Sequence, residues 1–193
     1  MSEHRHVRTD RLALDAITAT DLEPMFALHS DPAVWRHLPS GRHRDREQTA
    51  RFVAEIEHEW ANGGLCWWGA RPLEDTPDGP TAGTLIGIGG CACRLGVVWN
   101  LYYRLAPTAW GHGFANEIVR AGREAAAAVD SQMPVVAYLL EHNAGSKHTA
   151  ERAGLTLAWR GPDPGNPDPA AVRLIYTDRH LETDTLDRLV STA

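Results

Sequence analysis

Two glycines stand where a strand-like segment of the sequence gives way to a helix-like one. Residues 97–105 are rich in β-branched and aromatic side chains, which is typical of a strand. Residues 118–129 carry small and apolar side chains at helical spacing. A helix that begins directly after a strand leaves several backbone N–H groups unpaired at the positive end of its dipole. Gly111 and Gly113 therefore predict an anion site, most often one for phosphate.

The same stretch departs from two better-known phosphate-binding loops. A P-loop requires Lys followed by Ser or Thr after its last glycine, where this chain has Phe114 and Ala115. A dinucleotide-binding fingerprint requires a third glycine and an acidic residue after the next strand. Taken alone, the two glycines are equally compatible with a tight turn that binds no ligand.

A second stretch of candidate site residues, which begins at Asn143, follows the next apolar segment. Asn143 is a good helix cap, and capping alone is enough to explain it. Ser146 comes one turn later, where its hydroxyl can face whatever lies across the helix N-terminus. Gly154 is a natural end for this helix. The pattern thus predicts a short helix with two polar side chains at its first turn.

Cysteine and histidine spacing does not indicate a metal site. Cys66, Cys91 and Cys93 are too few for a disulfide framework, and the last two alternate in a strand-like run. Ten histidines are present, but none lies in a His-Glu-x-x-His or Cys-x-x-Cys arrangement. We expect three small buried thiols and no bound metal.

The rest of the chain supplies the strands and helices that must position these groups. Three consecutive strands joined by loops favour an antiparallel meander before the glycines, and residues before about Thr9 are expected to be a loose polar terminus. Strands are predicted at residues 11–17, 65–71, 84–93, 97–105, 134–141, 155–159 and 172–176, and helices at about 20–30, 45–60, 118–129, 143–153 and 181–190.

Length and composition favour a single domain over residues 1–193. Hydrophobic residues make up 43% and charged residues 23%, an ordinary globular composition. A net charge of −6 argues against non-specific nucleic-acid binding. No apolar run approaches the length of a membrane span, and the polar N-terminus lacks a signal-peptide core. We expect a cytoplasmic protein.

The glycine stretch and the segment that begins at Asn143 together resemble motifs of the GNAT N-acetyltransferase superfamily. The stretch 110–115, Trp-Gly-His-Gly-Phe-Ala, is similar to the acetyl-CoA loop of that family, Gln/Arg-x-x-Gly-x-Gly/Ala. Asn143, Ser146 and the pair Gly154-Leu155 are similar to its Asn-x-x-Ser segment and following Gly-aromatic pair. Residues 9–12, Thr-Asp-Arg-Leu, resemble the branch that acetylates ribosomal-protein N-terminal alanines, with its small-molecule relatives. The resemblance spans about residues 9–178.

The resemblance implies an α+β fold and a direct transfer reaction. The fold would be a GNAT-like mixed sheet of about seven strands, mostly antiparallel, flanked by helices and splayed around a V-shaped acetyl-CoA cleft. An amine would attack the thioester of acetyl-CoA within a ternary complex. The acceptor would be a protein N-terminus, a small amine or an amino acid, and a homodimer formed through an unpaired closing strand is plausible.

The resemblance also implies a role for each motif residue. Backbone N–H groups of the loop would bind the pyrophosphate, with Trp110 supporting the loop and Asn116 adding a side-chain donor. The strand end at Tyr103 and Leu105 would hydrogen-bond the pantetheine, and the Leu105 N–H would polarise the thioester oxygen. The pyrophosphate-binding residues would be Gly111, His112, Gly113, Phe114 and Ala115. Asn143 would anchor the pantetheine, Ser146 would protonate or hydrogen-bond the leaving thiolate, and Arg152 or Lys147 would reach the adenosine phosphate.

The proton-transfer residues depart from the family pattern. Many relatives carry a Tyr general acid where this chain has Ala150, which leaves Ser146 as the nearest replacement. Asn100 lies where relatives often carry Glu, and it cannot accept a proton. The general base therefore stays open among Glu141, the histidines His29 and His37, and a chain of waters. Glu117 is more simply explained by the helix dipole.

These departures keep two alternatives open. One is a non-catalytic acyl-CoA-binding or regulatory module with the same fold. The other is an acyltransferase that uses a longer donor such as succinyl-CoA, whose extra carboxylate would require a basic residue such as Arg36 or Arg42 in the cleft.

Overall fold

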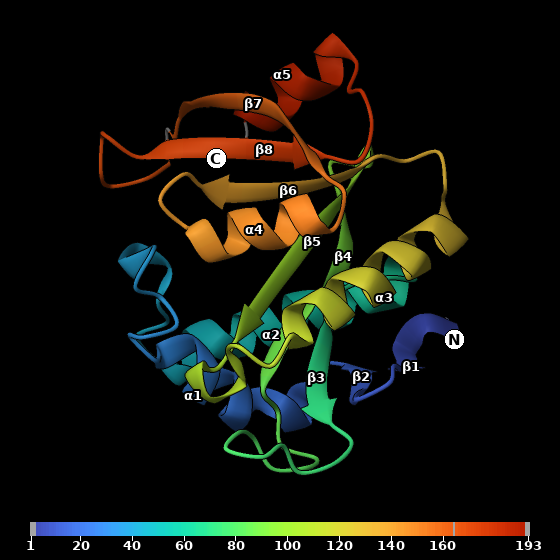
Figure 1. The fold of residues 1–193 in the computed structure, drawn as a ribbon, viewed down its shortest axis with the longest axis vertical. Helices are drawn as coiled ribbons and strands as arrows, with labels where there is room; N and C mark the ends of the chain where they lie inside the picture. Colours follow the sequence, from blue (N-terminus) through green and yellow to red (C-terminus); the bar gives the residue numbers. More distant parts are fainter. Residues whose placement is uncertain (1–2, 164, 192–193) are drawn as a thin grey trace.

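The computed structural model describes residues 3–163 and 165–191 and contains one eight-stranded mixed sheet, in the order β1-β2-β3-β4-β5-β6-β8-β7 (Figure 1). The strands are β1 (His6–Arg8), β2 (Leu12–Ala16), β3 (Trp68–Pro72), β4 (Gly87–Arg94), β5 (Val98–Leu105), β6 (Val135–Leu140), β7 (Thr156–Pro162) and β8 (Val172–Thr177). The helices are α1 (Leu22–Ser30), α2 (Arg46–Asn62), α3 (Phe114–Val129), α4 (Ala144–Arg152) and α5 (Thr183–Ser191). Short 3₁₀ turns lie at Glu3–Arg5, Ala19–Asp21, Pro39–Gly41 and Pro107–Ala109. The mixed, mostly antiparallel architecture that the sequence predicts is confirmed.

One strand pair opens the sheet. Neighbouring strands pair antiparallel except β5 and β6, which run parallel. Their register consists of two residue pairs, Trp99 with Val135 and Asn100 with Val136. Beyond Asn100 the strands diverge, as Figure 1 shows. The expected splay is therefore present, and it lies directly before the glycine loop.

The N-terminus corrects one expectation. Residues 3–8 are not loose, because β1 pairs with the outer edge of β2 through His6–Asp15, Val7–Leu14 and Arg8–Ala13, and the first two residues of that prediction lie outside the described ranges. The Trp68 indole also donates to the His4 carbonyl at 2.8 Å. A three-residue strand with one apolar side chain is too short to produce a visible pattern. Strand β1 is the additional strand in a sheet that has eight strands where about seven were expected.

Helix α3 lies unusually close to the sheet. Its Gly122 stands against Gly90 of β4, and a Cβ atom at Gly122 would lie 3.0 Å from the Gly90 Cα. Small side chains on this helix, including Ala121 and Ala125, are buried in the same core. Close helix–sheet contact of this kind fixes the position of the helix N-terminus, and hence of the loop before it.

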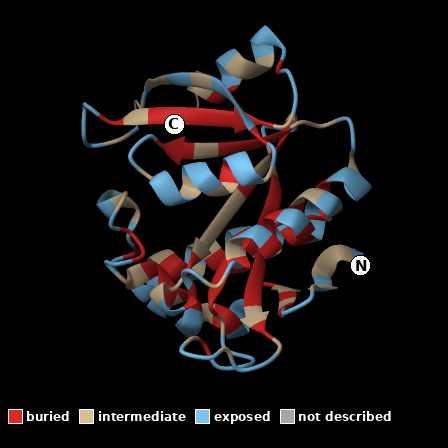
Figure 2. Cartoon of the chain, in the orientation of Figure 1, coloured by how far each residue is buried: buried red, intermediate tan, exposed pale blue. Residues whose placement is uncertain are grey.

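Two apolar clusters cover the sheet. The larger fills the space among α1, α2, α3 and the strands from β2 to β6, and the smaller lies beneath α5 with Leu181 and Leu189 at its centre. Figure 2 shows β4, β6 and β8 largely buried, much of β5 intermediate and β7 mostly exposed, with the inner helix faces buried and the outer helix faces exposed. Within the described ranges, no helix is both long and apolar enough to cross a membrane.

Candidate active site

The glycine loop has the geometry of a strand-to-helix anion site. Gly111 and Gly113 both adopt φ +81°, a left-handed conformation that favours glycine, and Gly113 caps α3. The Trp110 indole donates to the Leu105 carbonyl at 2.9 Å, although 44% of this residue is exposed. Trp110 thus ties the loop back to the end of β5, as a supporting residue would.

Five successive backbone N–H groups of this loop face no protein acceptor. In the part of the chain that the structure describes, the N–H groups of residues 111–115 make no hydrogen bond, and the first donor after them is Asn116, which bonds the Gly113 carbonyl at 3.1 Å. They lie at the positive end of the α3 dipole. The arrangement suits a phosphate or pyrophosphate group. The Asn116 side chain is exposed beside them.

An arginine far away in sequence holds the loop in place. Arg11 donates to the His112 carbonyl at 2.9 Å, and its guanidinium lies 2.9 Å from the Glu117 carboxylate. It also lies 4.8 Å from the centre of the Phe114 ring. The N-terminal segment therefore fixes both the loop and the first turn of α3. Arg11 stands directly before β2 in the Thr-Asp-Arg-Leu stretch of residues 9–12.

Glu117 serves this anchor and not proton transfer. Burial by itself raises the pKa of its carboxyl, but hydrogen bonds from Thr9 and Arg11 and the charge of Arg11 outweigh burial and hold that pKa below the ordinary value. The side chain is buried and lines neither of the cavities described below. Its position in the first turn also suits the helix dipole, as the sequence indicates.

The backbone of β5 alternates between its two neighbours. Ala106 donates its N–H to Ile86 at 2.8 Å, on the β4 side, and Trp99 donates to Pro134 at 2.8 Å, on the β6 side. Successive residues of a strand direct their N–H groups to opposite edges. Residues of β5 with odd numbers therefore direct their backbone groups toward β6.

This alternation leaves two backbone groups at an open edge. Because pairing with β6 ends at Asn100, Tyr103 and Leu105 direct their N–H groups into the space between the diverging strands. The Leu105 carbonyl already accepts a hydrogen bond from the Trp110 indole. The N–H of Leu105 is therefore the backbone group of this residue that a ligand can reach. The edge can bind an extended ligand as an added strand.

A cleft of about 300 Å³ occupies the splay between β5 and β6. It brings together Tyr103, Asn143 and Ser146, which the sequence predicts as site residues. The Asn143 side chain accepts the Ser146 N–H at 3.2 Å, so it caps α4 as predicted. Its own amide N–H groups donate to no protein acceptor within the described ranges.

The sequence did not predict the position of the Tyr103 side chain. Its hydroxyl donates to the Ser146 carbonyl at 3.2 Å, which places a phenol beside the first turn of α4. Burial raises the pKa of this phenol and keeps it protonated. The alternation of side chains along β5, which places Leu101, Tyr103 and Leu105 on one face, is the signal that could have indicated it.

Other predicted residues lie outside the cleft. Arg152 and Lys147 are exposed on α4 and line neither cavity, and the same holds for Arg36 and Arg42. Glu141 is exposed and pairs with Arg160, whose hydrogen bond to the carboxylate lowers the Glu141 pKa.

Two histidines were candidates for the general base. His29 is buried and lines neither cavity. His37 does line the cleft, but burial and then the charges of Arg104, His142 and Arg36 lower its pKa to about 4. The imidazole of His37 is therefore neutral near pH 7 and a weak base.

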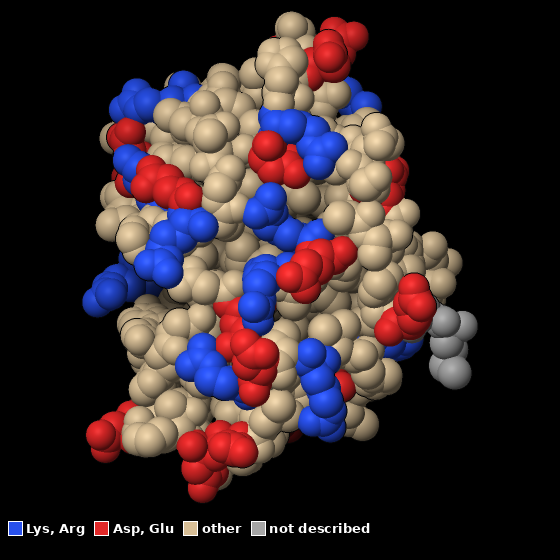
Figure 3. Space-filling model, turned by 45° about the vertical axis from the view of Figure 1, so that its right-hand side comes forward, with Lys and Arg blue, Asp and Glu red and all other residues tan. Residues whose placement is uncertain are grey.

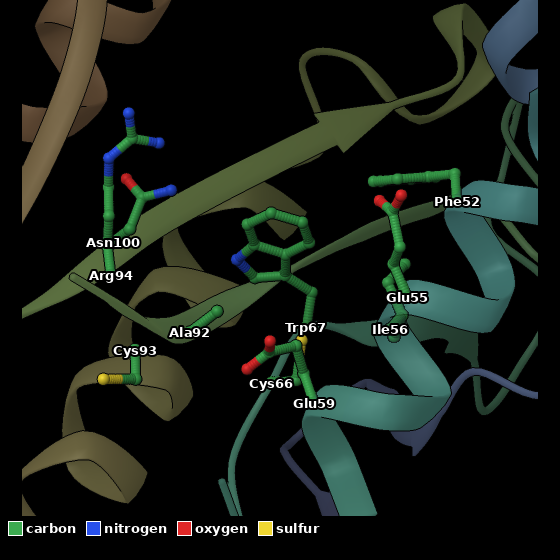
Figure 4. Close-up of a pocket in the computed structure, with 10 residues that line it drawn as sticks. All are labelled: Phe52, Glu55, Ile56, Glu59, Cys66, Trp67, Ala92, Cys93, Arg94 and Asn100. Carbon is green, nitrogen blue, oxygen red and sulfur yellow. The ribbon is translucent and has the colours of Figure 1, made fainter. Parts of the chain in front are cut away.

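A second cavity of about 320 Å³ lies on the α2 side of the sheet (Figure 4). Glu55 and Glu59 of α2 and the ring of Trp67 line it, and sequence reasoning missed all three. Their spacing was a usable signal, because residues four apart lie on one face of a helix. Asn100 lines both this cavity and the cleft.

On the face drawn in Figure 3, basic and acidic side chains lie side by side. Among residues 3–163 and 165–191, no group of three or more His, Cys, Asp or Glu side chains could hold a metal ion.

The splayed sheet and the loop before α3 together define an acetyltransferase class. A family model described as "Acetyltransferase (GNAT) domain" matches residues 11–156, and the chain belongs to that family. A comparison with curated proteins found no match.

Solved structures share the fold. An acetyltransferase from Agrobacterium tumefaciens is 23% identical, with 91% of this chain and 94% of that chain covered and a TM-score of 0.68. RimL, a ribosomal L7/L12 alpha-N-protein acetyltransferase in complex with coenzyme A, is 14% identical, with coverage of 89% and 96% and a TM-score of 0.71. MccE, a microcin C7 self-immunity acetyltransferase in complex with acetyl-CoA and AMP, is 14% identical, with coverage of 88% and 92% and a TM-score of 0.67.

Proposed function

We propose that this protein is an acetyl-CoA-dependent N-acetyltransferase that acts on a primary amine. The observation that carries the proposal is the run of unpaired N–H groups at residues 111–115, in line with the open edge of β5. Membership of the GNAT family supports acetyl transfer. Relatives in complex with coenzyme A or acetyl-CoA support the same donor.

The donor would bind along one continuous path. The loop N–H groups would hold the pyrophosphate, with the Asn116 side chain beside them. The pantetheine would extend along Tyr103 and Leu105 as an added strand, and the Asn143 amide would donate to it. Arg152 would reach the adenosine phosphate from its exposed position on α4.

The transfer itself needs few protein groups. The amine nitrogen attacks the thioester carbonyl carbon, forming the C–N bond, and the Leu105 N–H stabilises the oxyanion that develops. The C–S bond then breaks, and the sulfur leaves as a thiolate that Ser146 hydrogen-bonds and that ends as the free thiol of CoA. The nitrogen gives up its proton to water, because the carboxylate that lines the cleft, Asp163, is held in an ion pair with Arg173.

Two alternatives remain distinct from this proposal. A non-catalytic acyl-CoA-binding module is favoured by Ala150 and Asn100, which stand where relatives carry proton-transfer residues. A succinyl-type donor has weaker support, because Arg36 and Arg42 are exposed and line neither cavity.

An acceptor screen tests the proposal. The purified protein is incubated with acetyl-CoA and a panel of amines, amino acids and short peptides, and acetylated products are identified by mass spectrometry. We expect at least one amine to be acetylated in a protein-dependent manner. Binding of acetyl-CoA without any acetylated product would favour the non-catalytic module.

The assembly and compartment complete the proposal. Strand β7 is an edge of the sheet, and Leu157 on it is 49% exposed. Pairing of two such edges would produce a homodimer. Three free cysteines suit a reducing compartment, in keeping with the cytoplasm.

A further inference from the structure

The cavity on the α2 side has no role in the path described for acetyl-CoA. It lies against the sheet face opposite α3, whereas the loop and α4 approach from the other side (Figures 1 and 4). It meets the cleft at Arg94 and Asn100, which line both spaces. A molecule in this cavity would therefore reach the splay between β5 and β6, where the thioester would lie.

Two carboxylates give this cavity its charge. Glu55 and Glu59 lie one turn apart on α2, and within the described ranges neither forms an ion pair. Other exposed carboxylates nearby do have partners: Glu47 pairs with Arg51, for example. Two unpaired carboxylates that share a cavity attract a cation at modest strength, because solvent screens them.

Aromatic rings form the wall between the carboxylates and Asn100. The rings of Phe52 and Trp67 lie 6.1 Å apart, and Trp67 lies 4.8 Å from Tyr102. Aromatic faces bind ammonium groups through their quadrupole. The Trp67 indole N–H is buried and has no acceptor in the described part of the chain. Figure 4 shows this nitrogen directed toward the side of the cavity where Asn100 lies, so it would bond an oxygen of a ligand.

The charges within the cavity are separated. Arg94 lies at the Asn100 end, 4.8 Å from the Tyr138 ring, and the two carboxylates lie on α2 (Figure 4). A positive charge near a reacting nitrogen favours its neutral, nucleophilic form. The carboxylates, in contrast, favour a permanent cation at the other end of the same molecule.

We propose that this cavity is the acceptor pocket and that it selects an amine that carries a second positive charge and an oxygen acceptor. The second cation would lie between Glu55, Glu59 and the Trp67 ring, the oxygen would accept the indole N–H, and the reacting nitrogen would lie at Asn100. The proposal rests on the proposed acetyltransferase function and names its substrate class.

Three amino acid amides test the charge requirement. Lysine amide carries two ammonium groups and a carbonyl oxygen, norleucine amide keeps the shape but has one ammonium group, and glutamic acid 1-amide places a carboxylate there instead. We expect kcat/KM with acetyl-CoA to be at least tenfold higher for lysine amide than for norleucine amide, and lowest for the glutamic acid derivative. The KM for lysine amide should rise with ionic strength.

A variant pair links this preference to the pocket. In the double variant Glu55→Gln and Glu59→Gln, kcat/KM for lysine amide should fall to about that for norleucine amide. The affinity for acetyl-CoA should stay unchanged. Glu124→Gln, an exposed carboxylate on α3 that lines neither cavity, should behave as the wild type. A wild type that prefers norleucine amide, or a double variant that keeps the preference, would overturn the proposal.

Calorimetry separates this proposal from the function on which it rests. Lysine amide is titrated into wild-type protein and into the double variant, each with coenzyme A present. Heat of binding in the wild type that disappears in the variant supports the pocket, and absent binding in the wild type overturns it. Acetylation of other amines with no dependence on Glu55 and Glu59 would leave the acetyltransferase function intact and remove this substrate class.

Discussion

Two hydroxyl groups, those of Tyr103 and Ser146, lie near the first turn of α4, whereas the position of the family tyrosine is occupied by Ala150. Ala150, where many relatives carry that tyrosine, is buried and cannot reach a ligand. Ser146 lines the cleft, and the Tyr103 phenol bonds its carbonyl from the facing strand. The pair places two O–H donors near the end of the path proposed for pantetheine.

Replacing Ser146 with Ala should slow turnover more than it weakens donor binding. A hydrogen bond to a developing thiolate is worth about 2 kcal/mol in the transition state, which corresponds to a fall in kcat of about 30-fold. The Kd for acetyl-CoA should change by less than about threefold, because the loop carries most of the binding. Steady-state kinetics and calorimetry measure the two effects.

A matched serine controls this substitution. Ser131 is exposed on the loop after α3 and lines neither cavity, so Ser131→Ala should leave kcat unchanged. Unchanged kcat in Ser146→Ala would remove Ser146 from the mechanism and direct attention to Tyr103→Phe.

At the residue scale, the sequence predicted those residues whose structural role depends only on their neighbours in the chain. Asn143 as a cap and the glycines as a turn follow from rules about helix ends, and both are present. Arg11 could not be predicted as the loop anchor, because its contact with His112 joins segments a hundred residues apart. Glu55 and Trp67 meet only when α2 packs on the sheet.

At the scale of elements, the strand–loop–helix unit depends on its left-handed glycines. A non-glycine residue at φ near +80° costs about 1 kcal/mol or more. Several glycines among the described residues share that conformation and have open space where a Cβ atom would lie. Two of them suit a comparison: Gly111 in the loop, at φ +81°, and Gly83 before β4, at φ +73°. An alanine at either position would have similar backbone strain, but only Gly111 lies in the proposed pyrophosphate loop.

Gly111→Ala and Gly83→Ala should therefore destabilise the protein equally and differ in function. We expect each to lower the free energy of unfolding by about 1 kcal/mol. Only Gly111→Ala should raise the Kd for acetyl-CoA, by about tenfold, because it disturbs the aligned N–H groups. Denaturant unfolding and calorimetry provide the measurements. Equal donor affinity in both variants would contradict a ligand role for the loop.

Most element positions follow from the sequence, whereas the opening between strands does not. Hydrophobic periodicity located β4, β5, β6 and all five helices within a few residues. β6 pairs with β5 over two residue pairs and with β8 over five. Such a splay depends on long-range packing, so the family resemblance predicted it and the residue pattern did not.

At the scale of the whole molecule, a buried histidine makes folding depend on pH. His29 is 1% exposed, stacks on His43 at 4.5 Å, and also faces Trp35 and Phe52. Burial, followed by the charges of His43 and Arg104, lowers its pKa from 6.5 to about 3. Between these two pH values the unfolded chain binds a proton at His29 that the folded chain does not.

Stability should therefore be complete above about pH 6.5 and should decline as the pH falls. The contribution of His29 is a loss of up to about 1.4 kcal/mol in unfolding free energy per pH unit. His29→Phe keeps an aromatic ring in the stack and should reduce this slope, measured by denaturant unfolding at pH 7, 6 and 5. His148→Phe, at an exposed position on α4, serves as the control. A slope identical in wild type and His29→Phe would show that His29 does not resist protonation.

The central claim is that the loop at residues 111–115 holds the pyrophosphate of acetyl-CoA, and a calorimetric titration tests it most directly. Acetyl-CoA is compared with acetylpantetheine, which has the same thioester and pantetheine but no pyrophosphate or adenosine. We predict one-to-one binding of acetyl-CoA and affinity for acetylpantetheine at least a hundredfold weaker. Equal affinity for the two, or no binding of acetyl-CoA, would contradict this role for the loop.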